Sequence, residues 1–361
     1  MPPPPASRVT LKHVAQRAGV SQATASKVLN GRTDVSKTTR DRVLRVIDEE
    51  GYRRSSARAT DVRRPQITAI FDGLTSQYAS LILQGMVTAA AERDTDIVVR
   101  LVPTAFSSTS PAAARTWIHE NASATGVIAV TSAVPQDVVR AASRLGLPLV
   151  TVDPVDPADS DVVSIGSTDW TGGRAVAEHL IDLGHTRIGW VGGLRGSVPS
   201  IERFQGYRSA LENAGLTADP SLHRSGPYSF EAGVELGGQL LDQEPRPTAI
   251  IGASDAIAFG ITEAARQRGL DLPGDLSVAG FDDIPQAEWT SPKLTSVRTP
   301  LIGIGRMATE TLFAMSEGRE PASHHIQLST RLIVRESTAP PRGATASEGS
   351  SQEAAAEATS A

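Results

Sequence analysis

Residues 9–52 read VTLKHVAQRAGVSQATASKVLNGRTDVSKTTRDRVLRVIDEEGY, and this stretch decides the fold of the N-terminal part of the 361-residue chain. Thr10 is a candidate helix N-cap, because its hydroxyl can accept a hydrogen bond from a free backbone N–H of the first turn. Apolar side chains follow at the i, i+3, i+4, i+7 spacing of one helix face: Leu11, Val14, Ala15 and Ala18. The pattern therefore predicts a short helix that begins at this cap.

Two more helices are predicted directly after the first. Gly19 supplies a tight turn, Ser21 caps the second helix, and Asn30-Gly31 ends it. After a polar loop, Ser36 caps the third helix. The inward positions are Ala25, Val28 and Leu29 in the second helix, and Val43, Leu44 and Ile47 in the third. Two short helices joined by a glycine turn and braced by a third are a helix-turn-helix unit, whose second helix enters the major groove of DNA.

The outward face of the second helix carries side chains that suit contacts with nucleic acid: Gln22, Ala23, Thr24, Ser26 and Lys27. A glutamine can bond adenine through two hydrogen bonds, a lysine can reach guanine, and hydroxyls bond phosphate oxygens. The alternative is a small helical bundle with an ordinary solvated face. Because the caps, the turn, the apolar spacing and the charge agree, we favour the DNA-binding interpretation.

This stretch resembles the N-terminal domain of the LacI/GalR family of bacterial transcriptional regulators. The resemblance is carried by a long series of residues at fixed spacing: Thr10-Leu11, Val14-Ala15, Ala18-Gly19-Val20-Ser21, Thr24, Ser26, Val28-Leu29-Asn30-Gly31, Val35-Ser36, Thr39-Arg40 and Gly51-Tyr52. It implies that Gln22, Ala23 and Lys27 choose the operator sequence. It also implies phosphate contacts for seven polar side chains: Thr10, Ser21, Thr24, Ser26, Asn30, Ser36 and Thr39.

Composition and charge limit the classes to which the chain can belong. The chain has no cysteine, which excludes disulfides and thiolate chemistry. It has no run of 18 apolar residues, and its first residues, MPPPPASR, lack a signal-peptide core, so we expect a cytoplasmic protein without a membrane span. Residues 1–64 hold 14 Lys and Arg against 6 Asp and Glu, a net charge of +8, whereas the remainder has a net charge of −13. A basic head on an acidic body suits a head that meets DNA and a body that does not.

We expect five consecutive segments along the chain. They are a disordered Pro-rich leader at 1–8, the helix-turn-helix domain at 9–52, a hinge or linker at 53–65, an effector-binding and dimerisation core of two lobes at 66–338, and a disordered Ala/Ser-rich tail at 339–361. The tail shows no leucine heptads that would form a coiled coil, so a dimer is expected rather than a tetramer.

The linker RRSSARATDVRRP departs from the family pattern. In the family this segment becomes a hinge helix on the operator, and a leucine from it wedges into the minor groove. This chain has Arg54-Ser55 where the family usually has Pro-Asn, and Thr60-Asp61 where the leucine is expected. Two interpretations stay open. The linker is either flexible and solvated, or its arginines contact phosphates or the minor groove, namely Arg53, Arg54, Arg58, Arg63 and Arg64.

From Gln66 onward, strand-like and helix-like segments alternate, which indicates parallel sheets covered by helices. A first set has strands at 67–71, 97–102, 126–130 and 149–152 and helices at 79–92, 112–120 and 136–145. A second set has strands at 187–191, 249–252, 277–280, 294–297 and 326–334 and helices at 175–183, 201–214, 231–241, 256–268 and 302–316. We therefore predict an N-terminal all-α helix-turn-helix domain plus an α/β core of two parallel-sheet lobes, as in periplasmic binding proteins.

The core also carries motifs of the family: Leu183-Gly184-His185, Glu202-Arg203, Gly206-Tyr207, Ser254-Asp255, Gly280-Phe281-Asp282-Asp283, Leu294-Thr295 and Arg335-Glu336-Ser337. The resemblance thus covers residues 9–338. It implies a small-molecule effector at the carboxyl ends of the strands, in the cleft between the lobes.

Polar and aromatic residues at the strand ends are candidates for holding a sugar. A carboxylate accepts two O–H bonds and a guanidinium donates two, which suits vicinal hydroxyls. The polar candidates are Asp72, Asp153, Arg203, Ser254 and Asp282, and the rings that could stack on a sugar are Tyr78, Trp170, Tyr228 and Trp289. By resemblance, Arg203 and Asp282 occupy the most typical effector positions. The alternatives are structural: loop caps for the aspartates, an ion pair between lobes for Arg203, and packing under loops for the rings.

The sequence gives little support for catalysis, because no nucleophile elbow, phosphate loop or metal-ligand cluster is recognisable in it. The glycine pair in Asp169-Trp170-Thr171-Gly172-Gly173 opens a helix and suits either an anion or close helix packing. We expect no enzyme activity, no cofactor and no metal.

Together these features predict a ligand-responsive, DNA-binding transcriptional regulator. We expect a homodimeric repressor of carbohydrate-utilisation genes that releases a pseudo-palindromic operator when a sugar or oligosaccharide binds. Two alternatives stay open. In one, the ligand is a corepressor that strengthens DNA binding, and in the other, the chain is a sugar-binding protein with a vestigial head.

Overall fold

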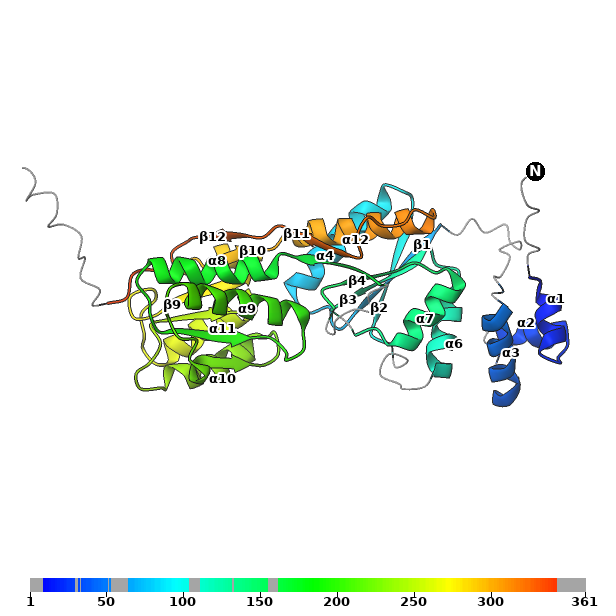
Figure 1. Ribbon diagram of the computed structural model, residues 1–361, viewed down its shortest axis with the longest axis horizontal. Coiled ribbons are helices and arrows are strands. Elements are labelled where there is room, and N and C mark those ends of the chain that lie inside the picture. The colour runs from blue at the N-terminus through cyan, green and yellow to red at the C-terminus, as the bar shows by residue number, and fades with distance from the viewer. Residues whose placement is uncertain are drawn as a thin grey trace, which may run out of the picture. The chain divides into compact units, whose positions relative to one another are not determined.

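The computed structural model describes residues 9–29, 32, 34–50, 52, 64–103, 111–131, 133–154 and 162–342 (Figure 1). The predicted leader at 1–8, the linker residues 53–63 with Arg58, the tail from 343 and Asn30 lie outside the described residues. The chain divides into two compact units. Unit 1 takes its residues from 1–167, 197–199 and 300–329, and unit 2 from 168–196, 200–299 and 330–361.

The N-terminal head consists of α1 (Leu11–Arg17), α2 (Gln22–Leu29) and α3 (Lys37–Glu50). The hydroxyls of Thr10, Ser21 and Ser36 each accept a hydrogen bond from the backbone N–H three residues later, so the three predicted caps are confirmed. Most of the predicted inward side chains form one small buried core together with Val46, whose members are Val14, Ala15, Ala18, Ala25, Val28, Val43, Leu44, Val46 and Ile47. The predicted Leu11 and Leu29 pack against this core but are only partly buried. Two helices and a bracing third therefore fold as the sequence predicts.

Unit 1 contains a six-stranded sheet in the order β11-β5-β4-β3-β1-β2, in which all neighbouring strands are parallel. Its strands are β1 (Gln66–Phe71), β2 (Asp96–Leu101), β3 (Gly126–Val130), β4 (Leu149–Val152), β5 (Val163–Ser167) and β11 (His325–Leu328). One face is covered by α4 (Gln77–Ala91) and α12 (Leu301–Ser316), the other by α6 (Pro111–Asn121) and α7 (Gln136–Leu145) (Figure 1). The central strands are fully buried because helices cover both faces.

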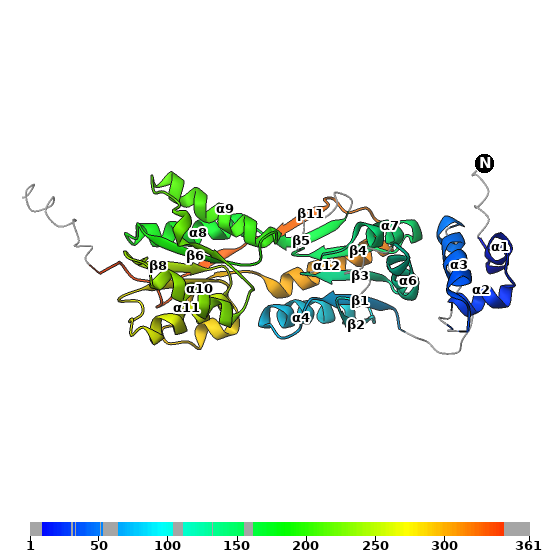
Figure 2. The same cartoon turned by 90° about the horizontal axis from the view of Figure 1, so that it is seen from below.

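Unit 2 contains a second six-stranded sheet, in the order β12-β10-β9-β8-β6-β7. Its strands are β6 (Ile188–Gly192), β7 (His223–Ser225), β8 (Ala249–Gly252), β9 (Ser277–Asp282), β10 (Thr295–Arg298) and β12 (Arg331–Ile333). Figure 2 shows α8 (Asp169–Asp182) and α9 (Val198–Asn213) on one face, and α10 (Phe230–Leu241) and α11 (Asp255–Gln267) on the other. The strands are parallel except for β12, which pairs antiparallel with β10.

Several predicted elements of the core need correction. The predicted strand at 326–334 is two strands that belong to different sheets, β11 in unit 1 and β12 in unit 2. The predicted helix at 302–316 was grouped with the second set, but α12 covers the sheet of unit 1. The short strands β5 and β7 were not predicted.

The described start of the predicted disordered tail is bonded to unit 2. The backbone N–H of Ala339 donates to Ser277 Oγ at 3.0 Å, and Arg342 pairs with Asp275. Residues 339–342, which were assigned to the tail from the sequence, therefore include two that bond to unit 2. Among the described residues, no helix is long and apolar enough to span a bilayer.

Candidate functional site

The second helix of the head presents its predicted DNA-contacting side chains to solvent. Gln22, Ala23 and Lys27 on α2 are exposed, whereas Ala25 and Val28 on the opposite face are buried in the head core. The predicted phosphate-contacting hydroxyls of Thr10, Ser21 and Ser36 occupy the caps, and Thr24 and Thr39 bond to two of these caps. Ser26 lies half-buried on α2. Hydroxyls at helix N-termini lie beside unpaired backbone N–H groups, which is a favourable place for a phosphate.

The strand ends of unit 1 bring three predicted effector residues into two hydrogen-bonded pairs. Asp72 follows β1 and accepts a hydrogen bond from Thr131 Oγ1 at 2.6 Å. Asp153 follows β4, and one of its carboxylate oxygens accepts from the hydroxyl of Tyr78, in the first turn of α4. Because β4, β3 and β1 are neighbours in the sheet, these side chains share one edge of unit 1. Thr131 and Asp153 have φ of 49° and 44°, a strained backbone that is concentrated at functional sites.

Arg203 on α9 is the centre of a buried charged group in unit 2. Its Nε donates to Asp169 Oδ1 at 2.6 Å, and its Nη1 donates to the carbonyl oxygen of Ala253 at 2.7 Å. The same Nη1 lies 3.3 Å from Asp282 Oδ1, and the guanidinium carbon lies 3.8 Å from the ring centroid of Phe281. Only 3% of Arg203 is exposed. The structural alternative of an ion pair between lobes is therefore wrong, since both carboxylates that pair with Arg203 belong to unit 2.

The burial of this group shifts the pKa of its members. Burial alone lowers the pKa of Arg203, but the charges of Asp169 and Asp282 raise it above its usual range, so the guanidinium stays charged. Burial raises the pKa of Asp282 to about 7, an effect that the nearby Arg203 opposes. Burial and the charge of Asp282 raise the pKa of Asp255 well above its usual range. With a pKa of about 7, Asp282 takes up its proton near neutral pH.

Asp282 is the last residue of β9 and has an unusual backbone conformation. Its φ is 103° and that of Asp283 is 53°, both in the region that side chains other than glycine rarely adopt. Asp282 Oδ1 is buried, and within the described chain it makes no hydrogen bond of ordinary geometry beyond its ion pair with Arg203. A buried carboxylate oxygen in this position retains the capacity to accept a hydrogen bond from a ligand.

Close packing of two helices positions Asp169 beside Arg203. A Cβ added at Gly173 of α8 would lie 2.0 Å from the carbonyl oxygen of Arg203, and one added at Gly206 of α9 would lie 2.0 Å from the carbonyl oxygen of Trp170. The backbones of α8 and α9 are therefore in direct contact where the helices cross. This crossing places the first turn of α8 beside the guanidinium of Arg203. Close packing thus explains both glycines of α8, because a Cβ at Gly172 would lie 2.7 Å from the ring of Phe281 and one at Gly173 would meet the backbone of Arg203. The carboxylate of Asp169 lies in the first turn of α8, where it disfavours a bound anion.

The remaining predicted effector residues differ in how enclosed they are. Ser254 is buried and caps α11 by accepting from the backbone N–H of Ile257, so its hydroxyl already has a structural role. Tyr228 is half-buried, and its ring packs so closely on Gly193 that a Cβ there would lie 2.0 Å from Cζ. Trp170 is 39% exposed and lies near the guanidinium of Arg174. Trp289 is 73% exposed, so among these residues it has the least structural support for a role in enclosing an effector.

The residues that contact the predicted effector residues were not chosen as candidates from the sequence. Asp169, Phe281 and Thr131 each contact a predicted effector residue, but none of them was selected from the sequence. Asp255, which bonds Ser296 Oγ and the backbone N–H of Ile284, was seen only as part of a family motif. The available signal was position: each of these residues lies at the start of a helix or the end of a strand.

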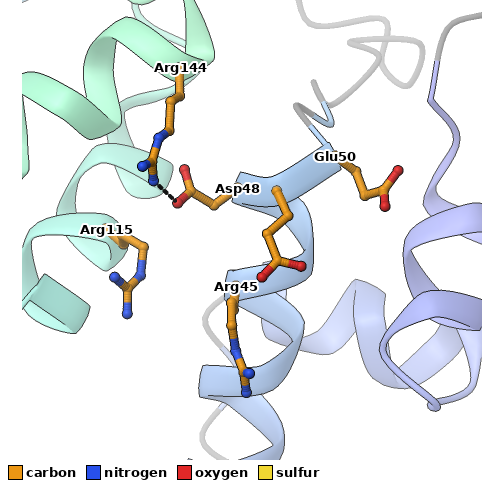
Figure 3. Close-up of a pocket in the computed structure, with 6 residues that line it drawn as sticks. Arg45, Asp48, Glu50, Arg115 and Arg144 are labelled. Atoms are coloured by element: carbon orange, nitrogen blue, oxygen red, sulfur yellow. Dashed lines mark hydrogen bonds and ion pairs between the residues drawn. The ribbon is translucent and has the colours of Figure 1, made fainter.

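A charged pocket of unit 1 lies outside both predicted sites. It is lined by Arg45, Asp48, Glu49 and Glu50 of α3, Arg115 of α6 and Arg144 of α7 (Figure 3). Arg144 points at Asp48, and its Nη1 donates to Oδ2 at 2.8 Å. Three arginines against three carboxylates leave no net charge with which to attract a ligand. Glu50 is also paired with His13 and Arg17 of α1, so we interpret this lining as salt-bridged surface.

Comparison with known proteins supports both parts of the chain. The family model of bacterial regulatory proteins, lacI family, matches residues 10–55, and that of the periplasmic binding protein-like domain matches residues 177–338. The chain is 31% identical over 339 residues to the HTH-type transcriptional regulator CelR of Thermobifida fusca, which covers 91% of this chain and 98% of the relative.

Solved structures of transcriptional regulators share the fold. A transcriptional regulator CelR–cellobiose complex has a TM-score of 0.67 and 30% identity, covering 91% of this chain and 100% of the other. The lac repressor dimer bound to operator and the anti-inducer ONPF has a TM-score of 0.66 and 25% identity, covering 92% and 100%.

A helix-turn-helix head on a core of the periplasmic-binding-protein type defines a class of ligand-responsive, DNA-binding transcriptional regulators, whose members here are not enzymes. The match extends over nine-tenths of the chain and nearly all of its relatives. The chain belongs to the LacI family. The predicted family and fold class are thereby confirmed.

Proposed function

We propose that this protein is a cytosolic repressor of carbohydrate-utilisation genes that releases a pseudo-palindromic operator when an uncharged sugar binds. The observation that supports this most directly is the buried Asp169–Arg203–Asp282 group at the strand ends of unit 2. Buried charges are costly unless they are paired, so a group of three in a fold of this class points to a functional site. The family membership supplies the DNA-binding half of the proposal.

The charges of this group favour an uncharged ligand that donates hydrogen bonds. Arg203 is already held by two carboxylates and a carbonyl oxygen, so the group carries one cation against two carboxylates. A phosphorylated or carboxylated ligand would bring a further negative charge to it. Asp282 Oδ1 and the carboxylates of Asp72 and Asp153 are acceptors, which suit sugar hydroxyls.

We propose that residues of both units contact the sugar. In unit 2 these are Arg203, Asp282, Ser254, Tyr228, Trp170 and Trp289, and in unit 1 Asp72, Tyr78 and Asp153. The cellobiose in the complex of the relative CelR supports a carbohydrate as the ligand class.

The DNA-binding half of the proposal assigns operator selection to Gln22, Ala23 and Lys27. Phosphate contacts come from the hydroxyls at the helix starts and, beyond the described residues, from Asn30 and Arg58. Two heads of a homodimer would bind two half-sites, because the two-fold symmetry of a protein is mirrored in its operator. The operator complex of the lac repressor dimer supports this arrangement.

The test is fluorescence anisotropy on labelled duplexes from the promoters of its own gene and its neighbours, with and without sugars. The panel should contain neutral mono- and disaccharides and the phosphorylated form of each monosaccharide. We expect tight, sequence-selective binding that one neutral sugar releases and its phosphate does not. If a ligand tightens DNA binding, the ligand is a corepressor and not an inducer. If the protein binds no duplex selectively, the alternative of a sugar-binding protein with a vestigial head is favoured.

A further inference from the structure

In the head of the free protein, the ammonium group of Lys27 is paired with a carboxylate. Its Nζ lies 2.6 Å from Asp34 Oδ2, at hydrogen-bond and ion-pair distance. Both side chains are about half exposed, at 53% and 54%. The pair lies on the face of α2 that also presents Gln22 and Ala23, where the second helix of this unit meets DNA.

The described residues around Asp34 are bonded to both neighbouring helices. The backbone N–H of Arg32 donates to the carbonyl oxygen of Lys27 on α2 at 3.1 Å, and the backbone N–H of Arg40 on α3 donates to that of Ser36 at 2.9 Å. The guanidinium of Arg40 on α3 donates to the carbonyl oxygen of Arg32. Asp34 follows two residues later, just before the cap at Ser36. The residues two positions before and two positions after Asp34 are therefore both hydrogen-bonded to helices, and the carboxylate between them lies beside the ammonium of Lys27.

We propose that Asp34 is a positioning residue that neutralises Lys27 until base contacts replace it, and so suppresses sequence-blind DNA binding. This inference rests on the proposed role of Lys27 at the operator. On DNA without the right bases, the pair can remain intact and presents no net charge to the phosphates. On the operator, hydrogen bonds from Lys27 to base edges compensate for the separation of the pair.

Removing the carboxylate should therefore strengthen binding to any DNA. With Asp34→Asn, Lys27 becomes free to take one phosphate on any sequence. One added phosphate contact steepens the slope of log K against log salt by about 0.9, which corresponds to roughly fivefold tighter binding at 0.15 M salt. The operator complex, in which Lys27 has already left Asp34, should gain less, so the ratio of specific to non-specific affinity falls.

The experiment measures binding of the full-length protein to a random-sequence duplex and to the operator duplex. Each titration is repeated at salt concentrations from about 50 to about 200 mM, because one phosphate contact changes the slope of log K against log salt by about 0.9. Asp41→Asn on α3 is the matched control, because it removes the same charge from the head at a position outside the pair. Both changes are repeated in a Lys27→Gln background. Thermal melts check that each variant folds.

We expect Asp34→Asn to tighten random-duplex binding and steepen its salt slope beyond the effect of Asp41→Asn. In the Lys27→Gln background the two changes should become equal, because Asp34 then has no ammonium to hold. The proposal is overturned if Asp34→Asn matches Asp41→Asn in the wild-type background, or if its extra effect survives without Lys27. Neither outcome depends on a sugar, so the effector part of the proposed function is tested separately.

Discussion

At the scale of single residues, Arg203 shows how a family motif predicts a position but not its chemistry. The motif with Glu202 suggested Arg203, and the motif around Phe281 suggested Asp282. Asp169 lies 34 positions before Arg203 and has no periodic relation to it, so the sequence pattern could not reveal that the guanidinium is shared by two carboxylates. This pairing decides the sign of charge that the group can accept, and therefore the ligand class that we propose.

Effector binding should depend on pH near neutrality through Asp282. Only the ionised carboxylate offers both of its oxygens as pure acceptors, because protonation turns one of them into a donor, and burial raises the pKa of Asp282 to about 7. The inducing sugar should therefore bind about tenfold more weakly at pH 6 than at pH 8, which isothermal titration calorimetry can measure. Asp282→Asn should bind weakly at both pH values. A flat wild-type profile would contradict the assignment of Asp282 as an acceptor.

The raised pKa of Asp282 also predicts how the free energy of unfolding changes with pH. The folded Asp282 carboxyl holds its proton more tightly than the unfolded one, so the free energy of unfolding should fall as pH rises from about 4 to about 7. Chemical denaturation at several pH values checks the sign. In Asp282→Asn this contribution is absent, and the decline across that window should become shallower.

Replacing Arg203 by lysine should separate charge from geometry. A lysine keeps the positive charge but loses the planar fork that reaches Asp169 and the carbonyl oxygen of Ala253 together. We expect sugar affinity to fall about tenfold or more and the free energy of unfolding to fall by about 2 kcal/mol, with operator affinity nearly unchanged. The control is Arg208→Lys on the same helix, where the arginine pairs with Glu212 at the surface. Equal effects of the two variants on sugar affinity would refute a special role for Arg203.

At the scale of elements, the crossing of α8 and α9 depends on glycine. Gly173→Ala would place Cβ 2.0 Å from a backbone oxygen that cannot rotate away. The helices must separate, at a cost of about 1–3 kcal/mol, and the distance between Asp169 and Arg203 must grow. We expect a lower unfolding midpoint in urea and weaker sugar binding.

Gly303→Ala on α12 is the control for this change. Its nearest neighbour would be the end of the flexible Leu328 side chain at 3.2 Å, so it should be neutral or stabilising by up to about 1 kcal/mol. If both variants lose stability equally, the close crossing is not what requires Gly173.

Elements with strong local patterns were predicted to within a few residues, and those defined by tertiary pairing were not. The predicted ranges of α7, β4 and β8 agree with the structure because apolar runs and turn residues mark both of their ends. β5 reads VSIGS and β7 reads HRS, short segments that become strands only beside their neighbours. α8 begins at Asp169, six residues before its predicted start, because its first turn is occupied by polar residues and glycines.

At the scale of the whole molecule, the chain passes between its two units more than once. Unit 1 leaves off at Ser167, takes up the short segment Ser197–Pro199, resumes at Pro300 with α12 and β11, and gives way to unit 2 again at Thr330. From the sequence, the elements were divided into two consecutive sets, and α12 was therefore assigned to the wrong sheet. Neither the apolar pattern nor the length of this helix indicates which sheet it covers. The chain therefore connects the two units covalently at several points. Under the proposed function, a sugar that binds one of two states of the core better shifts the core toward that state.

That coupling is reciprocal, which gives the most demanding test of the proposed function. If the sugar weakens operator binding by some factor, bound operator must weaken sugar binding by the same factor, on the usual scale of about 5- to 150-fold. Sugar affinity should be measured by calorimetry with no DNA, with saturating operator duplex and with a scrambled duplex as control. Equal factors in the two directions would establish an inducer. Tighter sugar binding in the presence of operator would make the ligand a corepressor, because a ligand shifts an equilibrium only toward the state that it binds better.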